Sequence, residues 1–124
     1  MADEIQMSAR LYASKGGASI NNQTFNVVTN MTGTDMGQQT QDVSSGGELL
    51  DITADLALPY KLFVYNMDLV HTIGIGDIAS QVSGYWFRIP PQQFALLPYT
   101  NTAMYVTCTT AGATAKIFSQ FCEI

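Results

Sequence analysis

Charge is the first thing that this sequence has little of. Charged residues make up 12% of its 124 residues, about half the ~25% of an ordinary globular domain. Five are basic and ten are acidic, for a net charge of −5, and the basic residues form no stripe that could neutralise phosphates. Direct binding to nucleic acid is therefore not expected. A surface with few charges also opposes association weakly, so the composition favours a homo-oligomer.

The residues on which most enzymes and metal sites depend are scarce too. The one histidine, His71, is interpreted as an ordinary strand residue, since catalysis by histidine usually needs a partner acid. Cys108 and Cys122 have no CxxC spacing, and metal sites need clustered ligands. The GIGD segment at 74–77 lacks the third glycine and the helix of a nucleotide-binding loop. We predict no catalytic residue, no metal and no cofactor, and hence no enzyme.

Long apolar runs are missing as well. No stretch approaches the ~20 apolar residues of a membrane helix. The opening MADEIQMSAR begins with acids and has no apolar segment of the kind that defines a secretory signal. The sequence therefore predicts no membrane association and a protein made in a cytosol.

Two cysteines in such a protein are predicted to be free thiols. If the last two strands form a hairpin centred at 111–112, Cys108 lies opposite Ala115 and Cys122 opposite Asn101. The two sulfur-bearing residues are then roughly 20 Å apart, whereas a disulfide needs Cα atoms within about 7 Å.

What the sequence does have is alternation of apolar and polar residues, the mark of half-buried strands. The strongest example is PYKLFVYNMD at 59–68, with Leu62 and Val64 on one face and Phe63 and Tyr65 on the other. A strand that is apolar on both faces lies deep in a sandwich or beneath a neighbouring subunit. Phe63 and Tyr65 are therefore candidate interface residues.

The first strand, at 5–13, alternates in the same way. Ile5 and Met7 are apolar, yet they stand at a terminus, where order normally needs an anchoring contact. Residues 1–7 are therefore predicted to form an N-terminal arm that contacts a neighbouring chain, with Ile5 and Met7 as candidate interface residues.

Turn signals recur every 8 to 12 residues along much of the chain, which is typical of a sandwich or barrel. We predict a single domain over 1–124, an antiparallel all-β sandwich of jelly-roll type with about eight to ten short strands. The polar run at 38–42 is expected to be an exposed edge or a loop, and 47–58 a short helix. Further predicted strands lie at 19–32, 69–77, 83–89, 92–97, 103–109 and 114–124.

The segment RIPPQQFALLP, at 88–98, places two prolines between short strands. Proline fixes φ and gives no N–H to a ladder. The prolines at 90–91 are therefore predicted to end one strand and direct the next, and Pro98 to end the strand at 92–97.

Trp86 and Arg88 share one face of the strand at 83–89. A buried tryptophan, a protein interface and a platform for stacking a sugar remain alternatives. Trp86 and Arg88 complete the set of candidate interface residues.

The C-terminal half carries a recognisable series of motifs: a strand ending in NMD, a proline corner, a FALLP strand and a closing apolar strand ending in an acid. This series resembles the pattern of small virion structural proteins of tailed bacteriophages, in which Pro-Gly often stands where this chain has Pro-Gln. The resemblance covers roughly 58–124 and rests on Asn66-Met67-Asp68, Pro90-Pro91, Phe94 to Pro98 and Glu123.

The resemblance implies a part of a virion, and we predict a capsid decoration or cement protein that binds and stabilises the outer capsid shell. Its partners would be the major capsid protein or neighbouring virion proteins. It would be located in the virion, assembled in the host bacterial cytoplasm. A neck or tail component is the alternative within this class. A carbohydrate-binding module using Trp86 is the alternative of another class.

Overall fold

A computed structural model describes residues 4–20, 23–30, 36–50, 60–76, 87–100 and 104–123, and of residues 98–100 it describes the backbone alone. Throughout these ranges the secondary structure is β, with twelve strands and no helix. The chain divides into two compact units, Met1–Thr32 and Gly33–Ile124. Each unit is described by itself.

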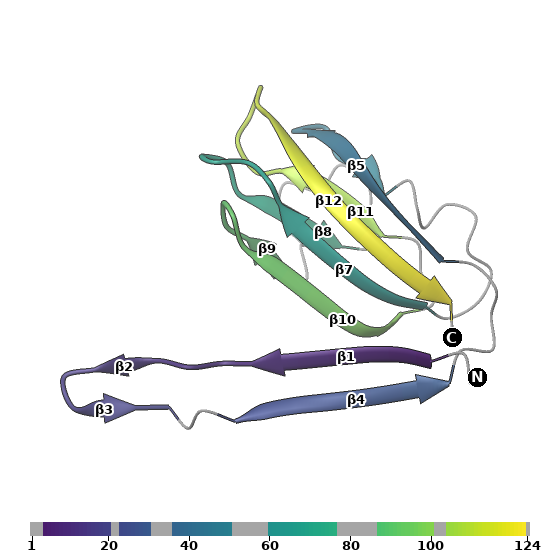
Figure 1. The fold of residues 1–124 in the computed structure, drawn as a ribbon. Coiled ribbons are helices and arrows are strands. Elements are labelled where there is room, and N and C mark those ends of the chain that lie inside the picture. Colours follow the sequence, from purple (N-terminus) through teal and green to yellow (C-terminus); the bar gives the residue numbers. More distant parts are fainter. Residues whose placement is uncertain are drawn as a thin grey trace. The chain divides into compact units, whose positions relative to one another are not determined.

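The first unit is a long β-hairpin (Figure 1). β1 (Glu4–Arg10) pairs antiparallel with β4 (Thr24–Asn30), and β2 (Ser14–Lys15) pairs with β3 (Ala18–Ser19) close to the turn. The turn is made by Gly16 and Gly17, whose φ angles of 59° and 84° lie in the left-handed region that glycine tolerates. The strand predicted at 5–13 is thus confirmed over its first part, and residues 4–7 of the expected arm are paired within this hairpin.

In its described residues the second unit has eight strands, all joined by antiparallel ladders. They are β5 (Met36–Ser44), β6 (Glu48–Leu49), β7 (Tyr60–Asn66), β8 (Ile73–Gly76), β9 (Phe87–Ile89), β10 (Phe94–Thr100), β11 (Tyr105–Cys108) and β12 (Thr114–Glu123).

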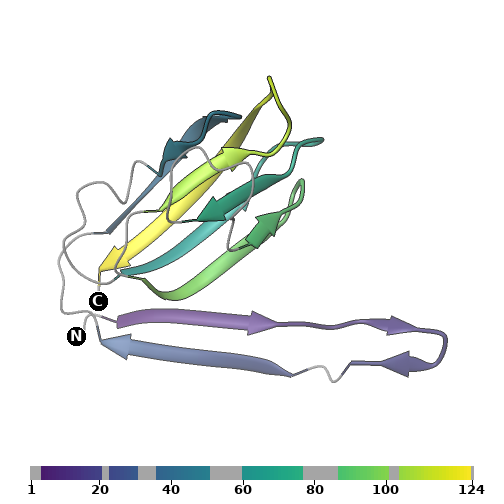
Figure 2. The same ribbon diagram turned by 180° about the vertical axis from the view of Figure 1, so that it is seen from behind.

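These strands pair in a nested order. β5 pairs with β12, β6 with β11, β7 with β10 and β8 with β9, so that the first strand of the unit meets the last and the pairing proceeds inward. The result is two four-stranded sheets, β10-β7-β12-β5 and β6-β11-β8-β9, which form the two layers of the unit (Figures 1 and 2). This is the strand order of a jelly roll. The predicted all-β sandwich of jelly-roll type is confirmed, with twelve strands among the described residues rather than the eight to ten expected.

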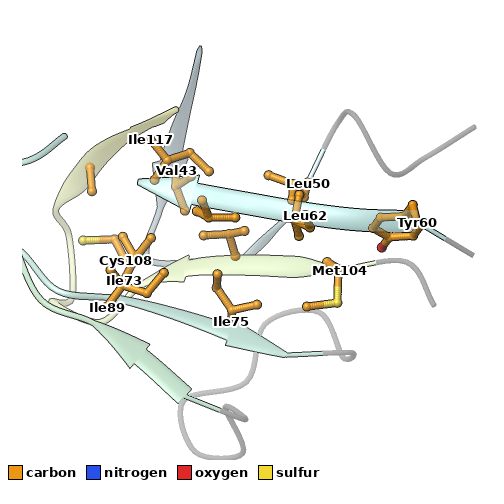
Figure 3. Packing of buried hydrophobic residues seen from close by; sticks show 13 residues of the cluster. Val43, Leu50, Tyr60, Leu62, Ile73, Ile75, Ile89, Met104, Cys108 and Ile117 are labelled. Atoms are coloured by element: carbon orange, nitrogen blue, oxygen red, sulfur yellow. The ribbon is translucent and has the colours of Figure 1, made fainter. Parts of the chain in front are cut away.

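The core lies between these two sheets (Figure 3). Among the residues that the structure describes, thirteen buried side chains form this core, all from the second unit. In β12, for example, Ala115 and Ile117 are buried while Lys116 between them is exposed, because successive side chains of a strand point to opposite faces. Burying each large aliphatic side chain contributes roughly 1.5–3 kcal/mol to stability. Because all of these core side chains belong to the second unit, this unit has a hydrophobic core of its own.

The last two strands do not form the predicted hairpin. The turn at 109–113 leads from one sheet to the other, because β11 pairs with β6 and β8 whereas β12 pairs with β5 and β7. Cys108 lies opposite Ile73 rather than Ala115, and Cys122 lies opposite Met36 and Lys61. Both cysteines are free, as predicted. They are separated by their positions in different sheets, and the predicted hairpin register was wrong.

Two other local predictions meet the structure differently. The polar run at 38–42 belongs to β5, which is an edge strand of its sheet, so the expectation of an exposed edge is confirmed. The prediction of a short helix at 47–58 is wrong for its first residues, because Glu48 and Leu49 form the strand β6. Residues 51–59 lie outside the described part of the chain.

Asn66, the last residue of β7, joins the two sheets at one rim of the sandwich. It is fully buried. Its Nδ2 donates hydrogen bonds to the carbonyl oxygens of His71, at 2.8 Å, and Ile89, at 3.0 Å. Its Oδ1 accepts the N–H of Asp68 at 3.0 Å. Because Ile89 belongs to β9 in the opposite sheet, one amide fixes the β7–β8 turn and the proline corner together.

The proline corner is a tight turn held by the backbone of the same asparagine. The N–H of Gln93 donates to the carbonyl of Pro90 at 3.2 Å, and the N–H of Gln92 donates to the carbonyl of Asn66 at 3.0 Å. Gln92 has φ 58°, a left-handed value that favours glycine at this turn position.

The prediction that Pro98 ends its strand is wrong. β10 runs on through Pro98 to Thr100, with a register shift between Leu97 and Thr100. β10 is an edge strand, where a missing N–H is tolerated. Pro98 therefore breaks the ladder locally without ending the strand.

Asp68 caps the turn between β7 and β8. Its Oδ1 accepts the N–H of Val70 at 2.7 Å and of His71 at 2.6 Å, and lies 3.2 Å from His71 Nδ1. The backbone N–H groups of His71 and Val70 stabilise the carboxylate and lower the pKa of Asp68 below its ordinary value of 3.8.

Replacing this acid, Asp68→Asn, is expected to lower stability at neutral pH, by an amount that shrinks as pH falls below 3.8. Because the pKa is lower in the folded state, ionisation stabilises the fold above the ordinary pKa. This contribution disappears as pH falls through the lowered pKa. Urea unfolding of both proteins at neutral and acid pH measures the effect. A difference that is constant with pH would show that the charge of Asp68 does not stabilise the turn.

Candidate interaction surfaces

The sheet β10-β7-β12-β5 carries an aromatic surface on the side away from the core. In β7, Leu62 and Val64 are buried in the core, while Phe63 and Tyr65 point outward and are only partly buried. The register places Phe94 of β10 and Phe118 of β12 on either side of Tyr65. Residues directly opposite in an antiparallel ladder share a face.

Leu96 lies opposite Phe63 and completes this surface. Phe94 is 63% exposed, and its ring centroid lies 5.7 Å from that of Phe63, within the range of favourable aromatic pairs. Such a surface is what a protein contact would use, since aromatic anchors dominate binding energies. We call it the aromatic face, and it consists of Phe63, Tyr65, Phe94, Leu96 and Phe118.

The hairpin of the first unit has a second apolar surface. The ladder pairs Ile5 with Thr29, Met7 with Val27 and Ala9 with Phe25, so these residues share one side of the ribbon. We call this side the hairpin face. Ile5 is buried and Met7 is partly exposed. On this face Phe25 is 63% and Val27 52% exposed. Val28 is exposed on the opposite side of the ribbon, where it pairs with Gln6. Leu11, Tyr12 and Ile20 are further exposed apolar side chains of the hairpin.

A two-stranded hairpin is at best marginally stable alone in water. An extended hairpin with exposed large apolar residues is therefore expected to gain stability from a partner that covers its apolar face.

Of the remaining predicted interface residues, Arg88 lies on β9, opposite Gly74, with an exposed side chain. Trp86 lies outside the described residues, so the Trp86–Arg88 surface and the sugar-stacking alternative stay predictions. Sequence reasoning missed Phe94, Leu96 and Phe118, which join Phe63 and Tyr65 only through the strand pairing.

Among the described ranges, no group of three or more His, Cys, Asp or Glu side chains is placed to hold a metal ion. The prediction that His71 is a strand residue is wrong. His71 is partly buried in the turn before β8 (Ile73–Gly76), with its Nδ1 3.2 Å from Asp68 Oδ1. Burial raises the pKa of the Cys122 thiol, which disfavours the reactive thiolate.

No family profile, curated protein or solved structure matches this chain. In the part that the structure describes, no helix has the length and apolarity needed to cross a membrane.

Proposed function

We propose that this protein is a structural component of a tailed-phage particle, and most specifically a decoration protein that binds the outside of the capsid shell. The observation that carries the proposal is the hairpin face, an extended apolar surface on a unit of the chain separate from the jelly-roll core. A protein whose function is attachment needs such a surface, and it needs no catalytic pocket.

The jelly roll and the aromatic face support the same conclusion. Jelly rolls recur in viral capsid and lectin domains, although a fold alone does not define a function. The low charge of the chain, 12%, reduces repulsion where many copies lie side by side on a shell. The hairpin would attach the jelly roll to the shell through many small contacts, with the aromatic face available for a neighbouring subunit.

The proposal is tested on purified particles of the phage whose genome encodes the chain. Quantitative mass spectrometry is expected to find the protein in a copy number proportional to that of the major capsid protein. Antibody labelling in electron micrographs is expected to mark intact heads. Absence from the particles would refute a virion role, and labelling of the neck or tail would refute decoration. Specific binding to a glycan array would favour the carbohydrate-binding alternative.

A further inference from the structure

The four edges of the two sheets are protected very unequally. In the sheet β6-β11-β8-β9, the edge strands β6 and β9 have two and three residues. In the other sheet, β10 contains Pro98 and a register shift. Short strands, prolines and irregular registers are the usual means of preventing unwanted strand pairing. Three of the four edges therefore carry such a device.

β5 carries none of them. It has nine residues, Met36–Ser44, paired with β12 without a register shift. Its sequence, MGQQTQDVS, contains no proline, lysine or arginine, and its one charge is Asp42. Among the described residues, no strand pairs with the other side of β5.

The hydrogen bonds of Ser44 show which backbone groups face this open side. Its N–H donates to Glu48 Oε1 at 3.3 Å and its carbonyl accepts from the N–H of Gly47 at 3.5 Å, so neither group points toward β12. Backbone groups alternate sides along a strand. Met36, Gln38, Thr40 and Asp42 therefore direct their N–H and C=O groups outward as well.

From this geometry we propose that β5 pairs antiparallel with β5 of a second copy, making one continuous eight-stranded sheet. A two-fold axis at Gln39 pairs all four outward-facing residues, Met36 with Asp42 and Gln38 with Thr40. Up to eight backbone hydrogen bonds then form across the axis, two for each of these four opposed pairs.

The side chains suit this register. The two Asp42 carboxylates are six positions apart along the strands, about 20 Å, so like charges do not face one another. The axis also keeps core-facing residues opposite core-facing residues. Two residues that pair across an axis at Gln39 are either both odd-numbered or both even-numbered, and side chains of the same parity lie on the same face of the strand. Because β5 is complementary to itself in this register, a second copy of the chain is the partner proposed for its open edge. The inference is independent of the proposed function.

The first test removes one outward donor. Thr40→Pro deletes an N–H that β12 does not use, so the domain is expected to fold while the dissociation constant rises about 30-fold through the loss of one donor per copy. Thr40→Val keeps the N–H and is expected to associate as the original does. Light scattering and circular dichroism report mass and folding. A strict monomer at micromolar concentration, or an oligomer of unchanged affinity in Thr40→Pro, would overturn the proposal.

The second test reads the register by cross-linking in a Cys122→Ser background. Gln39→Cys is expected to form an intermolecular disulfide with itself, since directly opposed residues of a ladder lie about 4.5–5.5 Å apart, within reach of a disulfide. Asp42→Cys alone is expected to form none, but to link to Met36→Cys when the two variants are mixed. No disulfide from Gln39→Cys in an oligomeric preparation would show that β5 is not the interface.

Discussion

Replacing Asn66 by aspartate is expected to destabilise the protein by about 4 kcal/mol, because a buried donor becomes a buried acceptor or an unpaired charge. The native amide donates to the carbonyl oxygens of His71 and Ile89. An ionised carboxylate would face both oxygens with no proton to offer, and it would be buried in a residue that is 0% exposed in the native fold. Both the β7–β8 turn and the proline corner would lose their common anchor.

Urea unfolding at neutral pH measures this effect. Asn66→Ala is expected to cost less, about 3 kcal/mol, since it leaves two carbonyls unsatisfied but introduces no charge. The matched control is Gln93→Glu. It makes the same amide-to-acid change at the same corner on an exposed side chain, and it keeps the backbone bond to Asn66. Similar losses for Asn66→Asp and Gln93→Glu would show that the buried amide is not the anchor.

The behaviour of β7 shows how far alternation alone can predict this fold. Successive side chains of a strand point to opposite faces. The sequence alone therefore predicts that Leu62 and Val64 share one face of β7 and that Phe63 and Tyr65 share the other. The strand lies second in its sheet, between β10 and β12, as its apolar faces on both sides predict. The turns at 16–17 and 90–93 were also predictable from local sequence, since glycine tolerates the positive φ angles of the first turn and proline fixes φ in the second.

Alternation along one strand does not predict which distant strands pair with one another. The turn at 109–113 could close a hairpin or cross between sheets, and local sequence favours neither. The choice depends on β5 and β7 occupying both sides of β12, which is a property of the whole nested roll. Phe118 was therefore missed as a member of the aromatic face, although its alternation with Ile117 already placed it on the opposite side from the core.

The role of Asn66 was hidden for a related reason. The sequence shows an NMD turn, and an asparagine there is explained well enough by local turn preference. Its bond to Ile89 joins residues 23 positions apart, which requires the two sheets to meet at that rim. A local motif thus proved to be a long-range contact.

Removing residues 1–32 is expected to abolish the proposed attachment to a phage particle while leaving the jelly roll folded. None of the thirteen core side chains belongs to the first unit, so the midpoint of thermal unfolding should change by no more than about 5 °C, the equivalent of roughly 1 kcal/mol in a domain of this size. Attachment should fail because the hairpin face is lost. Co-sedimentation with particles assembled without this protein, together with circular dichroism, measures both properties.

A point variant in the full chain locates the contact on one side of the ribbon. Phe25→Glu places a charge on the hairpin face at a side chain that is 63% exposed, so folding should be nearly unaffected whereas binding to a covering partner should weaken strongly. Asn26→Glu adds the same charge one residue along, on the opposite side of the ribbon, and is expected to bind normally. Equal occupancy of the Phe25→Glu and Asn26→Glu proteins on the particles would exclude the hairpin face as the attachment surface. Full binding by the truncated chain would exclude the hairpin altogether.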